Sequence, residues 1–426
     1  MENKPGSKVK EAGNIFLEEI QAGPKKSGEK RSGIGQTLLI PVLAVITGLI
    51  IGAIFIILTS EQVYAAFAQG IGPGLSASWK AMADAYVALF HGSIGDPAKI
   101  VAALESGDSL AVKKAFNPIL ESLVASTPYI FAGLGVALGF RSGVFNIGAE
   151  GQIYMGAIFA TFVGYSVTGL PAIIHIPLTL LAGALGGALW GFIPGWLKAT
   201  TGAHEVINTI MMNYIAFRLS EWLLNGPMKR PGSFNPVSPT IQSSAFLPNI
   251  FGPPTRFHLG FFIALAVAAL VWWFLFKTTW GFELRTVGAN PRSARYAGMS
   301  IMVYTILGMA LSGALCGLGG ANEVLGVNHN LALAFSSGYG FDSIALALLG
   351  KNHPAGVILA ALLFGTLRNG ATQMQVSAGI PIYIISILQG IILAFIAAPA
   401  IIRTIYRLRA PKEGEQAVTV RSWGGS

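Results

Sequence analysis

Runs of apolar residues, separated by shorter polar stretches, recur along most of this 426-residue chain. A helix needs about 20 apolar residues to cross a bilayer core about 30 Å thick, and most of the runs have that length. The pattern predicts an all-α integral membrane protein with about ten transmembrane or half-membrane helices. The runs are residues 34–58, 118–140, 150–170, 172–197, 204–224, 259–276, 301–321, 341–350, 355–371 and 380–402.

Composition agrees with a membrane protein and argues against two other classes. Hydrophobic residues make up 53% of the chain and charged residues 11%, which is far from the balance of a soluble domain. The net charge is +9, but Lys and Arg gather near the ends of the predicted helices, so we expect contact with membrane lipid and no nucleic acid. Cys316 is the single cysteine, and the six histidines lack metal-ligand spacing, so we expect no disulfide within the chain and no metal site.

The distribution of basic residues predicts the orientation. With the N-terminus inside, the inner loops and tails hold 19 of the 28 Lys and Arg residues and the outer loops hold 7. Cytoplasmic loops carry this excess, so both termini are predicted to be cytoplasmic. The predicted organisation is a basic cytoplasmic tail (1–33), a transmembrane domain (34–402) and a cytoplasmic tail (403–426), with an extracytoplasmic insertion (59–118), a proline-rich extracytoplasmic loop (225–258) and a cytoplasmic loop (278–299).

Glycines in the fourth predicted span recur at every fourth position. Gly183, Gly187, Gly191 and Gly195 lie on one face of a helix and leave that face smooth. Small residues at this spacing let two membrane helices approach closely. We expect this face to pack against another helix and to carry no chemistry.

The first place with candidate chemistry is FRSGVFNIGAEGQIYMG, residues 140–156. Phe145, Asn146, Glu150 and Gln152 stand there among glycines. Polar groups at membrane depth usually face a cavity or the interior of the helix bundle, and a broken backbone is tolerated only where protein or water covers it. The segment is therefore predicted to line the solute pathway; the alternative is a short cytoplasmic loop between two spans.

A second such place lies in the other half of the chain. Asn322 and Glu323 precede a segment, residues 336–350, that is too short to cross the membrane and carries Asp342 near its start. Interrupted segments in corresponding positions of two halves are typical of a transporter's central pathway. Arg368 also lies in a predicted span, where it needs a partner or an aqueous path, and the sequence does not identify that partner.

The cytoplasmic loop WGFELRTVGANPRSARYAGMS, residues 280–300, has the signals of a short surface helix. Asn290 suits the N-cap and Pro291 the first helical position, and Gly298 can end the helix. Such a helix can fit a socket on a cytoplasmic partner. The alternative is a basic loop that anchors to lipid headgroups.

The chain contains none of the standard catalytic signatures: HExxH, GxSxG, CxxC and the phosphate-binding GxxxxGK[ST] are all missing. We therefore expect no catalytic residues. If transport uses ATP, another protein must bind it.

Five motifs together resemble a known family. FRSGVFNIGAEGQ, HEVINTIMMNYIA, GFELRTVGANPRSARYAGMS, GGANEVLG and GFDSIALALLGKNHPAG are similar, in this order, to the permease subunits of bacterial nucleoside and simple-sugar ABC importers, a group that includes ribose-type and branched-chain amino acid permeases. The resemblance covers residues 119–402. It implies a multi-pass protein of the bacterial cytoplasmic membrane that moves a solute by alternating access. Purine nucleosides are the first candidate for that solute.

The resemblance also implies partners and site residues. The partners are a cytoplasmic ABC ATPase that uses ATP and Mg, a second permease subunit of different sequence, and an extracytoplasmic substrate-binding lipoprotein, with no cofactor on this chain. The implied pathway residues are Asn146, Glu150 and Asp342, beside Phe145, Gln152, Asn322 and Glu323. The implied coupling helix on the ATPase comprises Gly288, Asn290, Pro291, Ala294, Arg295, Tyr296 and Gly298.

Two other classes compete with this interpretation. A stand-alone secondary transporter or channel would use Glu150, Glu323 and Asp342 as an ion or proton path. A membrane-embedded enzyme would need acids and histidines clustered at one interface, and the sequence shows no such cluster.

Overall fold

The computed structural model describes residues 34–380 and 383–408, and in this part helices dominate. No β-strand forms there; two isolated bridges, Val237 with Ala332 and Asn249 with His258, tie loops together. The predicted all-α class is therefore confirmed. The helices are α2 (Ile34–Thr59), α3 (Glu61–Phe67), α4 (Ile71–Ile94), α5 (Pro97–Ser106), α6 (Ser109–Arg141), α7 (Ala149–Ser166), α8 (Ala172–Thr201), α9 (Glu205–Asn225), α10 (Gly260–Lys277), α11 (Thr279–Ala289), α12 (Pro291–Tyr296), α13 (Ile301–Glu323), α14 (Tyr339–Leu349), α15 (Pro354–Ala378), α16 (Tyr383–Ala397) and α17 (Pro399–Ile405).

Every predicted apolar run contains a helix in the structure. Within the described part of the chain, 6 helices are long and apolar enough to cross a membrane, namely those in α2, α6, α8, α10, α13 with its extension, and α15. α14 is a shorter apolar helix, as its sequence predicts. The total number of spans stays a prediction, and residues 1–33, 381–382 and 409–426, which include both predicted tails apart from residues 403–408, lie outside the described residues.

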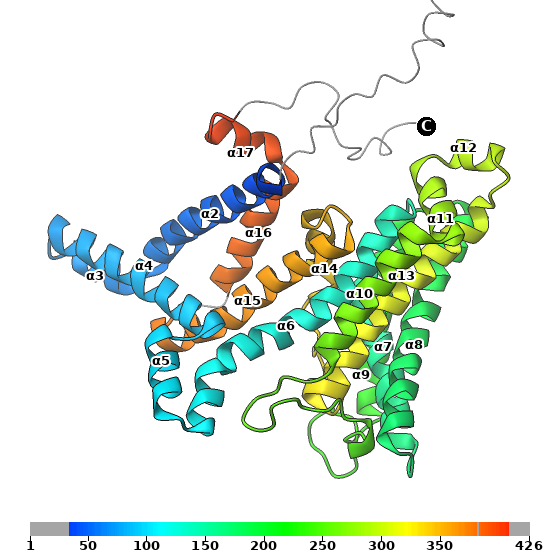
Figure 1. Cartoon of the computed structure of the whole chain (residues 1–426), viewed down its shortest axis with the longest axis horizontal. Coiled ribbons are helices and arrows are strands. Elements are labelled where there is room, and N and C mark those ends of the chain that lie inside the picture. The colour runs from blue at the N-terminus through cyan, green and yellow to red at the C-terminus, as the bar shows by residue number, and fades with distance from the viewer. Residues whose placement is uncertain (1–33, 381–382, 409–426) are drawn as a thin grey trace, which may run out of the picture.

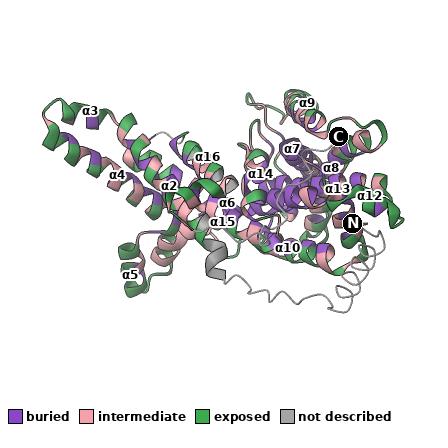
Figure 2. Cartoon of the chain, turned by 90° about the horizontal axis from the view of Figure 1, so that it is seen from above, coloured by how far each residue is buried: buried purple, intermediate pink, exposed green. Residues whose placement is uncertain are grey.

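The buried centre is formed by α6, α7, α10, α13, α14 and α15. α8 lies against it through its buried glycines (Figure 2). α8 and α13 pack with their backbones close together: a Cβ atom added at Gly187 would lie 2.7 Å from the Cα atom of Gly317. No side chain larger than hydrogen fits there without separating the helices. The predicted glycine face of α8 is confirmed.

The segment 59–118 folds into α3, α4, α5 and the start of α6. α6 begins earlier than the predicted apolar run because the carboxylate of Asp108 accepts hydrogen bonds from the N–H groups of Leu110 at 3.0 Å and Ala111 at 3.1 Å. α4 lies against α15, where the Nδ2 atom of Asn369 donates to the carbonyl oxygens of Gly92 and Pro118, each at 2.9 Å. The insertion is thus joined to the bundle by polar contacts.

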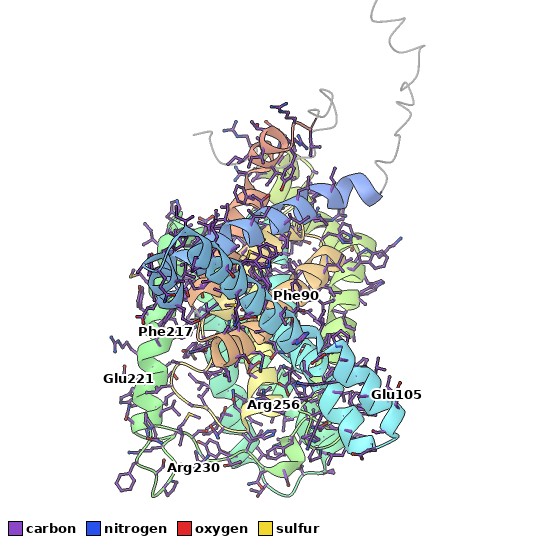
Figure 3. All side chains as sticks on the ribbon, turned by 90° about the vertical axis from the view of Figure 1, so that its left-hand side faces the viewer. Phe90, Glu105, Phe217, Glu221, Arg230 and Arg256 are labelled. Atoms are coloured by element: carbon purple, nitrogen blue, oxygen red, sulfur yellow. The ribbon has the colours of Figure 1, made fainter. Side chains whose placement is uncertain are left out.

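Different segments of the chain lie at the two ends of the helix bundle. α11, α12 and α17 lie at one end, and the connection from α9 to α10 lies at the other (Figure 1). Figure 3 shows Arg230 and Arg256 of that connection near its end of the molecule, with Glu105 of α5 toward the same end. This arrangement agrees with the predicted orientation, in which the first end is cytoplasmic; the sidedness itself stays a prediction.

Candidate functional site

The connection between α6 and α7 is held by a buried amide network. The Nδ2 atom of Asn146 donates to Oε1 of Gln152 and to Oγ of Ser312, each at 2.8 Å, and Oδ1 of Asn146 accepts from the N–H of Gly148 at 3.0 Å. Ser312, on α13, donates to the carbonyl oxygen of Gly135 on α6 at 2.7 Å. The hydrogen bonds of Asn146 and Gln152 therefore help to join α6, α7 and α13.

A further residue, which the sequence did not single out, fixes the same connection from α9. Oδ1 of Asn213 accepts from the N–H of Gly151 at 2.8 Å, and its Nδ2 donates to the carbonyl oxygen of Ile147 at 2.9 Å. Asn213 is 1% exposed, so these bonds replace water entirely. Its place within NTIMMNY, between apolar residues of a predicted span, was the available signal. Phe145 packs near Phe140, with ring centroids 5.1 Å apart.

The structure brings the two predicted polar places together at Glu150. This buried carboxylate accepts hydrogen bonds from the N–H groups of Gly340 at 2.6 Å and Gly338 at 3.3 Å. Both donors belong to the start of α14, whose free N–H groups favour a negative charge. Glu150 thus fastens the short helix α14 to the start of α7.

Asp342 belongs to a cluster on α6, α14 and α15. The Tyr129 hydroxyl donates to Oδ2 of Asp342 at 2.7 Å and accepts from NH1 of Arg368 at 2.7 Å. NH1 of Arg368 lies 3.7 Å from Oδ2 of Asp342, and the guanidinium lies over the Tyr339 ring, 4.5 Å from its centroid. The structure therefore supplies the partners of Arg368 that the sequence left open. The two tyrosines were missed because an aromatic residue in an apolar run gives no separate signal.

Asn322 and Glu323 end α13, just before the π-helical turn Val324–Asn328. Asn322 is 1% exposed, and its amide atoms have no hydrogen-bond partner among the described residues. Glu323 is 5% exposed and lies within electrostatic range of Arg368 and Arg256. Neither residue takes part in the hydrogen bonds of the Asn146 network among the described residues.

The outer connection reaches this region through Arg256. Its guanidinium binds the carboxylate of Glu121 on α6 with two hydrogen bonds, at 3.1 and 2.6 Å. These hydrogen bonds raise the pKa of Arg256. The neighbouring His258 is buried, and burial together with the positive charges of His329 and Arg256 lowers its pKa to about 4. The predicted outer loop is thus attached to α6 by a bidentate ion pair.

The predicted coupling helix is present as α12. Oδ1 of Asn290 accepts from the N–H of Ser293 at 3.1 Å, Pro291 occupies the first turn, and Gly298 has a φ of 79° just after the helix. The predicted cap and end are therefore confirmed.

The side chains of α12 divide between two environments. Tyr296 is 95% exposed, whereas Ala294 is 0% exposed. The methyl group of Ala294 therefore faces the protein and seats α12. The assignment of Ala294 to the coupling helix stays a prediction. Arg295 is exposed to solvent.

Gly288, at the end of α11, lies directly against the turn that follows α6. A Cβ atom added to Gly288 would lie 2.7 Å from the backbone nitrogen of Gly143, and one added to Gly143 would lie 2.7 Å from the Cα atom of Gly288. Gly143 also has a φ of 74°, which glycine adopts without strain. The end of α11 and the connection between α6 and α7 are therefore in backbone contact.

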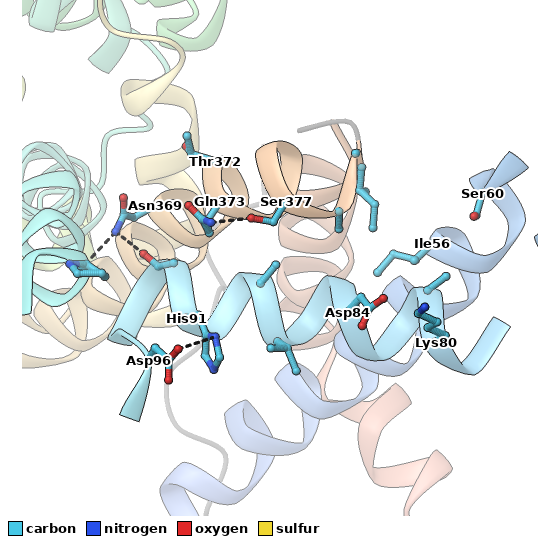
Figure 4. A pocket seen from close by; sticks show the side chains of 18 of the residues that line it. Ile56, Ser60, Lys80, Asp84, His91, Asp96, Asn369, Thr372, Gln373 and Ser377 are labelled. Carbon is cyan, nitrogen blue, oxygen red and sulfur yellow. Dashed lines mark hydrogen bonds and ion pairs between the residues drawn. The ribbon is translucent and has the colours of Figure 1, made fainter. Parts of the chain in front are cut away.

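No group of three or more His, Cys, Asp or Glu side chains within the described residues is arranged to hold a metal ion. A groove of about 1140 Å³ lies among α2, α3, α4, α5, α6 and α15 (Figure 4).

Comparison with known proteins identifies the family. The profile described as "Branched-chain amino acid transport system / permease component" matches residues 118–409. The guanosine ABC transporter permease protein NupP of Bacillus subtilis is 38% identical, over 86% of this chain and 95% of that protein. The glucose ABC transporter permease protein TsgB13 of Haloferax volcanii is 37% identical, over 65% of this chain and 75% of that protein.

A third relative, the nucleoside ABC transporter permease protein NupB of Lactococcus lactis, is 35% identical, over 67% of this chain and 80% of that protein. No solved structure matches the chain. These similarities favour the ABC permease over the stand-alone transporter. The chain belongs to the permease-component family, and it is a multi-pass cytoplasmic membrane subunit of an ABC importer in which a partner subunit hydrolyses ATP.

Proposed function

We propose that this chain forms part of the membrane pathway for a nucleoside, with purine nucleosides as the preferred class, and that alternating access driven by ATP moves the solute inward. The observation that carries the proposal is the match to a guanosine permease over 95% of that protein's length. A nucleoside permease of a second bacterium is also 35% identical.

The transporter that we propose contains more than this chain. Its other parts are a cytoplasmic ABC ATPase, which binds ATP and Mg²⁺, a second permease subunit of different sequence, and an extracytoplasmic substrate-binding lipoprotein. The family membership supports an ATPase and a binding protein in general.

The contact between Gly288 and Gly143 supports a mechanical route from the ATPase to the pathway. In this mechanism the ATPase holds α12 through exposed groups such as Tyr296, and its movement displaces α11. The displacement passes through the backbone contact to the connection that Asn146 stabilises. Glu150, at the start of α7, then transmits it to α14.

The test is reconstitution of the permease with its ATPase and binding lipoprotein in vesicles. We expect uptake of labelled guanosine that requires ATP and is inhibited by other purine nucleosides. Guanosine flux through the purified chain without any ATPase would contradict the mechanism.

A simple sugar is the second candidate solute, because a glucose permease is 37% identical. Labelled glucose is offered to the same vesicles. ATP-dependent glucose uptake that excess guanosine does not reduce would favour the sugar.

A further inference from the structure

The groove beside α15 has a polar lining in a protein that is mostly apolar. Lys80, Asp84, His91, Asp96 and Gln373 are among the side chains around it (Figure 4). Its volume of about 1140 Å³ is as large as a pocket for a small organic ligand. Ionisable side chains within a membrane protein face water or one another, so this lining suits an aqueous groove.

The groove opens at the end of the bundle that carries the outer connection. Glu121 lines it, and Glu121 is the residue that binds Arg256 of that connection. The end of α2 and the last turns of α15 also line it, through Thr59 and Ser377. Each of these helix ends lies away from α11 and α12, so the groove faces the predicted outside.

Helical spacing connects the groove with the Arg368 cluster. Thr372 lines the groove and follows Arg368 by four residues on α15, while Glu121 precedes Tyr129 by eight on α6. Residues at these spacings lie along one side of a helix. The side chains of Arg368 and Asp342 are 27% and 36% exposed, and charges that keep this exposure within spans face an aqueous path.

The cluster has unused hydrogen-bonding groups. A guanidinium has five N–H donors, and Arg368 uses two positions on described residues, the Tyr129 hydroxyl and the carbonyl oxygen of Ser337. Oδ1 of Asp342 accepts no hydrogen bond from the described part of the chain. Donors and an acceptor therefore stand side by side and are free for a solute.

We propose that this groove is the outer mouth of the permeation pathway and that Arg368, one turn from Thr372 on α15, and its neighbour Asp342 bind the solute directly. Arg368 donates to the carbonyl or ring nitrogen atoms of a nucleoside base, and Asp342 accepts from its ribose hydroxyls. The choice of a nucleoside rests on the proposed function.

The insertion acquires a role in this proposal. α4 and α5 supply one wall of the groove, and both precede residue 118, where the family match begins. The match to the guanosine permease covers 86% of the chain, which is more than residues 118–426 provide, so it extends into the insertion. At least one relative therefore has residues that align with this wall, although the family profile does not cover them.

The groove is tested by cysteine labelling of the assembled transporter in right-side-out vesicles. The natural Cys316 is 0% exposed and gives little background. Thr372→Cys places a thiol in the groove, and Leu359→Cys places one on a 60% exposed apolar position of the same helix. We expect a membrane-impermeant methanethiosulfonate reagent to label Thr372→Cys at least tenfold faster and to reduce solute uptake. Equal labelling rates, or labelling that leaves uptake unchanged, would overturn the groove as the mouth.

The solute contacts are tested by Arg368→Lys and Asp342→Asn, which keep side-chain size. We expect a roughly tenfold higher KM for guanosine uptake with normal membrane levels and normal ATPase binding. Asp342→Asn should also lose most of the preference for guanosine over its 2′,3′-dideoxy analogue, measured with the same binding protein as the wild type. A merely structural role would leave this preference unchanged.

Wild-type uptake of guanosine is measured first, because it separates the two proposals. Its absence overturns the proposed function. Normal wild-type uptake with unchanged analogue preference in Asp342→Asn overturns the assignment of the solute contact alone.

Discussion

The carboxylate of Glu150 accepts a hydrogen bond of 2.6 Å from the N–H of Gly340, a residue 190 positions later in the sequence. The bond joins the first turns of α7 and α14, so the two interrupted segments of the chain form one structural unit. A buried carboxylate bound by backbone N–H groups is held more strongly than a neutral acceptor. The position of α14 therefore depends on this contact.

Gly340→Ala is expected to destabilise the protein. A Cβ atom at this position would overlap the backbone nitrogen of Glu150, and rigid backbone cannot move aside as a flexible side chain can. We expect a loss of about 3 kcal/mol and a lower yield of folded protein. Thermal unfolding in detergent provides the measurement. Gly390→Ala is the control, since a Cβ atom there meets nothing described within 4 Å. Equal melting temperatures for the two variants would contradict the proposed packing.

Asn146→Ala is expected to lower stability as well as transport. The substitution leaves Oε1 of Gln152 and the N–H of Gly148 without their buried partner, at about 1–3 kcal/mol for each group. The free energy of unfolding should fall accordingly, whereas Asn225→Ala, on an exposed side chain, should change little. A variant that transports poorly but unfolds like the wild type would instead assign Asn146 to solute contact.

Tyr296→Asp and Ala294→Asp are both expected to reduce transport, the first by weakening ATPase binding and the second by weakening the fold. Tyr296 is 95% exposed, so its substitution should remove the ATPase from the purified complex and leave the permease folded. Ala294 is 0% exposed, so a buried charge there should reduce the folded permease itself. Size-exclusion profiles and the amount of co-purified ATPase distinguish the two effects. Full ATPase recovery with Tyr296→Asp would favour the alternative in which the loop only anchors to lipid headgroups.

Local signals predicted much of this fold because they act over a few residues. The length of the apolar runs predicted the helices, and Asn290 with Pro291 predicted the start of α12. Glycines at every fourth position, Gly187 among them, predicted a packing face. Each depends on neighbours in the sequence.

The sequence could not supply the partners of polar residues across the bundle. Asn146 meets Ser312 after 166 positions, and Arg368 meets Tyr129 after 239. Such pairs depend on how helices are arranged in space, which residue type and period do not determine. For the same reason the groove built by the insertion was not predicted.

The protein is expected to lose stability on acidification because of His258. Nδ1 of this buried side chain accepts from the N–H of Gly260 at 3.1 Å, so the ring is neutral in the folded state. Its pKa is lowered to about 4, first by burial and then by His329 and Arg256, whereas an unfolded histidine has a pKa of about 6.5. Between these values the unfolded chain binds more protons, so stability falls as the pH is lowered from about 6.5 toward 4, by about 3 kcal/mol in full.

Thermal unfolding in detergent between pH 7.5 and pH 5 measures this effect. His258→Gln cannot be protonated, so its melting temperature should fall less over this range than that of the wild type. Asn225→Ala is the control, because this exposed side chain does not titrate and its loss should leave the wild-type slope in place. If His258→Gln and the wild type lost the same stability, another group would be responsible. A flatter slope in His258→Gln alone would show that the outer connection requires a neutral ring beside Arg256.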